Sequence, residues 1–136
     1  MNEQRLKEMC ESFSSRVKIT PYYHMGYDII VYDWDEHCDC CGRHGEEWEF
    51  NYTYNIRPLL DYIGITFLDL EGIASGIELV KTLETMLERL TDKENIYALN
   101  QLEPSNGWGS RLGLIDVLRK ILATAKQVGH PRLGLL

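Results

Sequence analysis

A strictly alternating run near the middle of the chain constrains the fold more than any other feature. One face of this extended run carries Trp48, Phe50, Tyr52 and Tyr54, and the other carries Glu47, Glu49, Asn51 and Thr53. A second stretch, residues 27–34, is rich in β-branched and aromatic residues. The simplest arrangement pairs residues 27–34 with residues 47–54 as an antiparallel hairpin.

Helical periodicity flanks this hairpin on both sides. Five helices are expected. The first covers residues 3–15, and a short second one runs from Pro58 to Tyr62 and ends at Gly64. A long helix follows the capping pattern of Ser75 and Glu78, and the last two cover residues 93–102 and Ser110 to about Val128. The expected apolar stripe of the long helix is Ile77, Val80, Leu83, Leu87 and Leu90, and that of the last helix is Leu114, Ile115, Leu118, Ile121, Leu122 and Ala125. The sequence therefore predicts an α+β fold, with a small antiparallel sheet packed against four or five helices.

The length of 136 residues favours a single domain over residues 1–136. Within it, residues 1–20 are expected to form an accessory N-terminal helix and linker. Residues 27–128 are expected to form the core, and residues 129–136 a tail.

Charge and hydropathy narrow the classes of partner. The net charge is −7, from 21 acidic and 14 basic residues, which disfavours a nucleic-acid polymer as the main ligand. No apolar run reaches the roughly 18–20 residues that a membrane helix needs. The N-terminus is too polar for a signal peptide. We therefore expect a cytoplasmic protein whose cysteines are reduced.

Cysteines and histidines gather in the long connection between the two expected strands. The cluster consists of His37, Cys38, Cys40, Cys41 and His44. Cys38 and Cys41 form a CxxC pair followed by a glycine, a spacing that lets two thiolates hold one zinc ion. The other two ligands would come from His37, Cys40 and His44, so the pattern predicts a zinc site with spare candidates.

Three interpretations of this loop are open. A zinc ion with four protein ligands would only order the tip of the hairpin, and this structural role is the expected one. A zinc ion with an open water position would be catalytic and would need a nearby base, for which Asp39, Glu46 and Glu47 are available. A thiol-rich loop without metal is the third. The HxE and PCxxC elements of zinc deaminases are absent from the sequence.

Two asparagine motifs offer a different kind of site. The first is Asn51-Tyr52-Thr53-Tyr54-Asn55, where a strand turns into a helix, and the second is Asn106-Gly107-Trp108-Gly109, before the last helix. Trp108 could stack on a base, Arg111 could pair with a phosphate, and the helix start at residues 110–112 would offer free N–H groups. The competing interpretation is that both motifs only build turns and helix caps.

The same motifs resemble those of a family of small, largely uncharacterised proteins encoded mostly by bacteriophages and prophages. The resemblance covers residues 27–128 and rests on NxTxN and NGWG-type segments, here Asn51, Thr53, Asn55, Asn106, Gly107, Trp108 and Gly109. The Cys/His loop is not a feature of that family. The resemblance implies phage biology, in which small proteins often counteract host defence by binding.

The leading hypothesis is a non-enzymatic protein that sequesters a nucleotide-derived small molecule, as a homo-oligomer. Its expected ligand-binding residues are Asn51, Thr53, Asn55, Asn106, Trp108 and Arg111. One alternative is an inhibitor of a host defence protein, which would use an acidic surface and exposed tyrosines. A second alternative is a zinc-dependent hydrolase.

Overall fold

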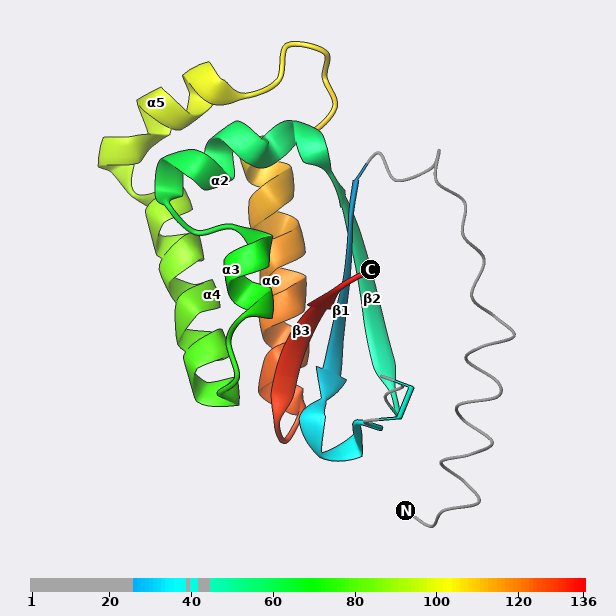
Figure 1. Ribbon diagram of the computed structural model, residues 1–136. Helices are drawn as coiled ribbons and strands as arrows, with labels where there is room; N and C mark the ends of the chain where they lie inside the picture. The colour runs from blue at the N-terminus through cyan, green and yellow to red at the C-terminus, as the bar shows by residue number, and fades with distance from the viewer. Residues whose placement is uncertain (1–25, 39, 42–44) are drawn as a thin grey trace.

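A three-stranded antiparallel sheet forms one layer of the protein, and the helices pack on one side of it (Figure 1). The computed structural model describes residues 26–38, 40, 41 and 45–136. The strands are β1 (Gly26–Asp33), β2 (Glu47–Thr53) and β3 (Pro131–Leu135), in the order β2-β1-β3. The predicted hairpin is confirmed, and its first strand is the centre of the sheet.

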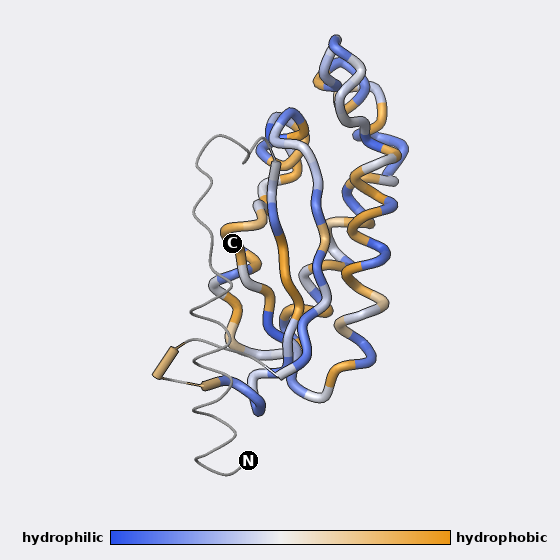
Figure 2. Tube along the Cα trace, turned by 90° about the vertical axis from the view of Figure 1, so that its right-hand side faces the viewer, coloured by the Kyte–Doolittle hydropathy of each residue, from blue (hydrophilic) through white to orange (hydrophobic). Residues whose placement is uncertain are grey.

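The register of β1 and β2 turns the aromatic face of β2 toward the helices. Tyr27 lies opposite Tyr52, and Ile29 lies opposite Phe50. Ile29 is fully buried in the core, and Phe50 and Tyr52 pack against it. A shift of one residue would turn the glutamates of β2 inward, so the alternation of the sequence excludes a one-residue shift of this register. The middle of β1 stands out as hydrophobic in Figure 2, as expected for the central strand.

Five α-helices and two 3-10 helices complete the described secondary structure. They are η1 (Trp34–Glu36), η2 (Tyr54–Ile56), α2 (Arg57–Ile63), α3 (Phe67–Glu71), α4 (Gly76–Thr91), α5 (Lys93–Leu102) and α6 (Arg111–Gln127). This arrangement confirms the predicted α+β class.

Local capping sets the helix ends that the sequence indicated. The Ser75 hydroxyl accepts the N–H of Glu78 at 3.3 Å at the start of α4. The Ser110 hydroxyl accepts the N–H of Gly113 at 2.9 Å at the start of α6. Gly64 closes α2 by donating its N–H to the carbonyl of Leu60 at 2.9 Å.

The core lies between the sheet and the pair of long helices α4 and α6. Of the expected buried face of α6, five residues are buried and Leu122 is partly buried. The buried stripe of α4 is Leu79, Leu83, Met86 and Leu90. Ile77 is 73% exposed, so its assignment to the stripe is wrong. It lies two positions before Leu79, which at 3.6 residues per turn is about 200° around the helix.

The expected tail is the main error of the sequence analysis, because Pro131–Leu135 form β3. Leu133 lies opposite Val31 and is 1% exposed. The N–H of Leu136 donates to the carbonyl of Asp28 at 2.9 Å. A proline is tolerated at the first position of an edge strand, because its missing N–H is not needed there.

The helices differ from the sequence-based expectation near the middle of the chain. Helix α3 was not predicted, and its Thr66 and Asp69 form a full capping box. The helix expected over residues 3–15 lies outside the described residues. No helix in the part of the chain that the structure describes is long and apolar enough to span a membrane.

Candidate metal centre and ligand-binding motifs

A turn of 3-10 helix carries the chain from β1 to the cysteines. Asp33 caps η1, because its Oδ1 accepts the N–H of Asp35 at 3.0 Å. The N–H of His37 then donates to the carbonyl of Trp34 at 3.0 Å. Cys38 follows directly and is 4% exposed. The first thiol is therefore buried just beyond the 3-10 turn that follows the central strand.

Three thiols meet beside this turn. The sulfur atoms of Cys38 and Cys40 lie 3.0 Å apart. Those of Cys38, Cys40 and Cys41 all lie within 4.8 Å of one another. Sulfur atoms bound at 2.3 Å to one tetrahedral zinc ion lie about 3.8 Å apart, so small movements would fit all three to one ion. The three cysteines could hold a metal ion.

The structure brings together only part of the predicted ligand set. Cys38, Cys40 and Cys41 form the group, and His37 does not belong to it. The His37 ring instead stacks on Trp34, with ring centroids 4.4 Å apart and planes inclined by 13°. His44 lies outside the described residues.

Strand β3 supports this loop from the side through Arg132. The guanidinium carbon of Arg132 lies 4.3 Å from the centroid of the Trp34 ring, within the range of a cation–π contact. Trp34 therefore contacts both the Arg132 guanidinium and the His37 ring. Burial raises the pKa of the neighbouring Tyr32 above its ordinary value of 10.0, and Arg132 opposes that rise.

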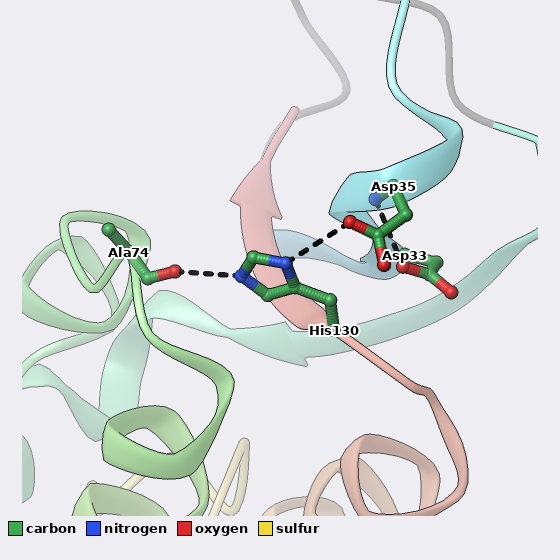
Figure 3. Close-up of polar contacts among 4 residues, drawn as sticks. All are labelled: Asp33, Asp35, Ala74 and His130. Atoms are coloured by element: carbon green, nitrogen blue, oxygen red, sulfur yellow. Dashed lines mark hydrogen bonds and ion pairs between the residues drawn. The ribbon is translucent and has the colours of Figure 1, made fainter.

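His130 joins the start of this loop to the helical layer (Figure 3). Its Nδ1 lies 3.4 Å from Oδ1 of Asp35, and its Nε2 lies 3.2 Å from the carbonyl oxygen of Ala74. Sequence reasoning missed His130 and Arg132, because both fell in or next to the expected tail. The alternation of Pro131, Leu133 and Leu135 is the signal that could have found them.

The two asparagine motifs are neighbours in space. The hydroxyl of Tyr52 accepts the N–H of Ser110 at 3.0 Å and donates to its carbonyl at 3.3 Å. A Cβ added at Gly109 would lie 2.6 Å from Cγ2 of Thr53. The end of β2 and the start of α6 are therefore in close contact, which sequence separation alone did not indicate.

The polar side chains of the first motif make local bonds. The Asn51 amide donates to Oδ1 of Asp28 at 2.5 Å across the β1–β2 pair. The N–H of Asn55 donates to the Thr53 hydroxyl at 3.2 Å, which caps η2. Within the described residues no hydrogen bond joins Asn51 or Asn55 to Asn106.

The second motif forms a tight turn with an exposed tip. Oδ1 of Asn106 accepts the N–H of Trp108 at 3.0 Å, which is an Asx turn. Gly107 and Gly109 have φ angles of 78° and 99°, a region that glycine adopts without strain. Trp108 is 68% exposed between them. Its ring is free for a partner, whereas Asn106 is engaged by the turn.

Three hydrogen bonds at the start of α6 compete with the expected phosphate site. The N–H groups of Ser110 and Arg111 are bonded, the first to Tyr52 and the second to Oε1 of Glu103 at 2.7 Å. The Arg111 guanidinium donates to the carbonyl of Leu90 at 3.0 Å. A carboxylate therefore lies where an anion would bind, and the arginine holds α4.

Helices α2 and α5 and the loop of residues 103–109 form one end of the molecule (Figure 1). Each of these segments carries a large aromatic side chain that is exposed. Tyr97 on α5 is 77% exposed and Tyr62 on α2 is 44% exposed. Tyr62 donates its hydroxyl to Asn95 at 3.4 Å, which ties α2 to α5. With Trp108, these side chains form what we call the aromatic end.

Comparison of the chain with protein-family models, with curated proteins and with solved structures found no match.

Proposed function

We propose that this protein acts by binding a partner, and that a zinc ion held by Cys38, Cys40 and Cys41 stiffens the loop between β1 and β2. The observation that carries the metal proposal is the convergence of three sulfur atoms within 4.8 Å. Thiolates select soft or borderline ions, and zinc is the commonest such ion in closed protein sites. A reducing cytoplasm would keep these thiols available.

The all-cysteine chemistry of the group fits a structural role, and a closed site would take its fourth ligand from the predicted candidate His44. A catalytic zinc ion needs an open position and a nearby base. Among the described residues the ligand group contains cysteines alone. Cys38 is 4% exposed and lies just beyond η1, the turn that follows β1, so an ion there would fix the path of the chain soon after it leaves the sheet.

Metal analysis tests this role directly. Protein purified in reducing buffer from zinc-supplemented cells is expected to contain about one zinc ion per chain, measured by mass spectrometry of the metal. Removal by a chelator is expected to change the fluorescence of Trp34, since the loop packs against it. Protein without bound zinc under these conditions would contradict the proposal.

The aromatic end supports a protein partner. Tryptophan and tyrosine are the residue types most enriched at the energetic centres of interfaces. Here Tyr97 and Trp108 are each more than two-thirds exposed, on segments that lie at one end of the molecule. A host defence protein is the kind of partner that the resemblance to phage proteins suggests.

A nucleotide-derived ligand is the second candidate partner, and Trp108 is the residue that supports it. Its exposed ring is suited to stacking on a base. The internal bonds of Arg111 leave the phosphate recognition in that hypothesis without support. The resemblance to phage proteins is compatible with both candidates.

Two single variants separate these candidates. In cross-linking pull-downs, Tyr97→Ala and Trp108→Ala are each expected to lower recovery of a specific partner about tenfold, as for interface centres worth more than 1 kcal/mol. Leu68→Ala is the control, because Leu68 is 67% exposed on α3. Partner recovery unchanged by both variants would contradict the protein-partner proposal. Thermal stabilisation by a nucleotide that only Trp108→Ala abolishes would favour the second candidate.

A further inference from the structure

A cavity of about 970 Å³ opens between the start of α4, the end of α6 and the start of β3. These three segments lie at the end of the molecule opposite the aromatic end (Figure 1). The volume falls in the range of small-molecule sites in proteins, about 300–1,000 Å³. We call it the α4–α6 groove.

Apolar side chains form most of its lining. Val80 and Val128 are half-buried and pack against the core. Ile77, two positions off the buried stripe of α4, lines the groove and is 73% exposed. One end is closed by direct packing, since a Cβ added at Gly76 would lie 2.5 Å from Cδ of Pro131.

The charged groups of the groove carry an excess of positive charge in a chain whose net charge is −7. Lys81, Lys126 and Glu84 lie along it. Nζ of Lys126 lies 3.8 Å from Glu84, and both side chains are more than half exposed, so this ion pair is weak. Lys81 has no ion-pair partner within the described residues. Among these residues Lys81 is therefore a cation without an ion-pair partner beside the apolar lining of the groove.

His130 contributes to the end of the groove near β3 without adding a free donor. Both of its ring nitrogens face acceptors, one on Asp35 and one on Ala74 (Figure 3). Its role is to hold the α3–α4 connection against η1. The groove keeps its shape at this end through that contact.

We propose that the α4–α6 groove binds a small amphipathic anion, a carboxylate with an aliphatic tail. The tail would lie on Ile77, Val80 and Val128, and the carboxylate would pair with Lys81 and Lys126. Burial of each methylene of such a tail raises the binding constant about fourfold, so the tail supplies the affinity and the lysines set the orientation. This site is separate from the thiol cluster and from the aromatic end, and does not depend on the proposed function.

Titration with decanoate tests this site in the full chain, by calorimetry. Wild-type protein is expected to bind one decanoate saturably and decanol at least about tenfold more weakly. Ile77→Ser is expected to weaken decanoate binding about fivefold, because an exposed apolar contact is removed. Lys81→Glu is expected to weaken it about tenfold, because attraction becomes repulsion.

Lys120→Glu is the matched control for charge. Lys120 lies on α6 outside the groove and pairs with Asp116 at 3.0 Å. This variant is expected to bind decanoate as the wild type does, and all three variants are expected to keep their unfolding temperature, since each replaced side chain is exposed. Equal binding of decanoate and decanol, equal loss in Lys120→Glu and Lys81→Glu, or no saturable binding would each overturn the proposal.

Discussion

At the proposed zinc site, a Cys38→Ser variant is expected to bind zinc more than about 100-fold more weakly than the wild type. The change removes the most buried of the three thiolates, and a hydroxyl is a poor ligand for zinc. Changes to residues that only support the ligands already cost about 10–100-fold, so loss of a ligand should cost more. Competition with a chromogenic chelator measures this affinity.

Three further variants make this result specific. Cys10→Ser removes the fourth cysteine, which is remote in sequence from the cluster, and is expected to keep the metal. His37→Ala is also expected to keep it, because the His37 ring stacks on Trp34. His44→Ala tests the remaining predicted ligand. If Cys38→Ser and Cys10→Ser bind zinc equally well, the three-thiol site is refuted.

Gly109→Ala is expected to lower the free energy of unfolding by about 2–5 kcal/mol. Gly109 has a φ of 99°, where a Cβ costs about 1–2 kcal/mol. The new Cβ would also lie 2.6 Å from Thr53 and 2.9 Å from the fully buried Ile56. Crowding in a packed interior adds about 1–3 kcal/mol. Urea unfolding measures the sum.

Gly107→Ala is the matched control for this junction. Gly107 lies in the same loop with a φ of 78°, but a Cβ there would have no neighbour within 4 Å. Gly107→Ala has only the free-energy cost of a Cβ at positive φ. Gly109→Ala should therefore be less stable than Gly107→Ala by about 1–3 kcal/mol. Equal stabilities would show that the second asparagine motif does not pack closely on the end of β2.

Much of the secondary structure could be predicted, because its signals are local. The alternation of residues 47–54 sets which face of β2 is buried, and the serine caps set where α4 and α6 begin. Strand β3 could not be recognised from its five residues alone. Its pairing with β1 depends on a partner about a hundred residues away, and such contacts leave no local signal.

The candidate sites also differ in how far neighbouring residues in the sequence determine them. Cys38, Cys40 and Cys41 are almost consecutive, so their proximity follows from the chain itself. The orientation of Arg111 cannot be read from neighbouring residues in the sequence, because its Nη1 donates to the carbonyl of Leu90, a residue of another helix.

The sequence by itself determined the α+β class, the hairpin register and the grouping of the three thiols, because each depends on residues close together along the chain. Only the tertiary structure decided the rest. It added β3 to the sheet, placed Arg132 and His130 against the loop that carries the thiols, and formed the α4–α6 groove from three separate segments. These features arise from packing between distant segments, which buries apolar surface and pairs polar groups only once the chain has folded.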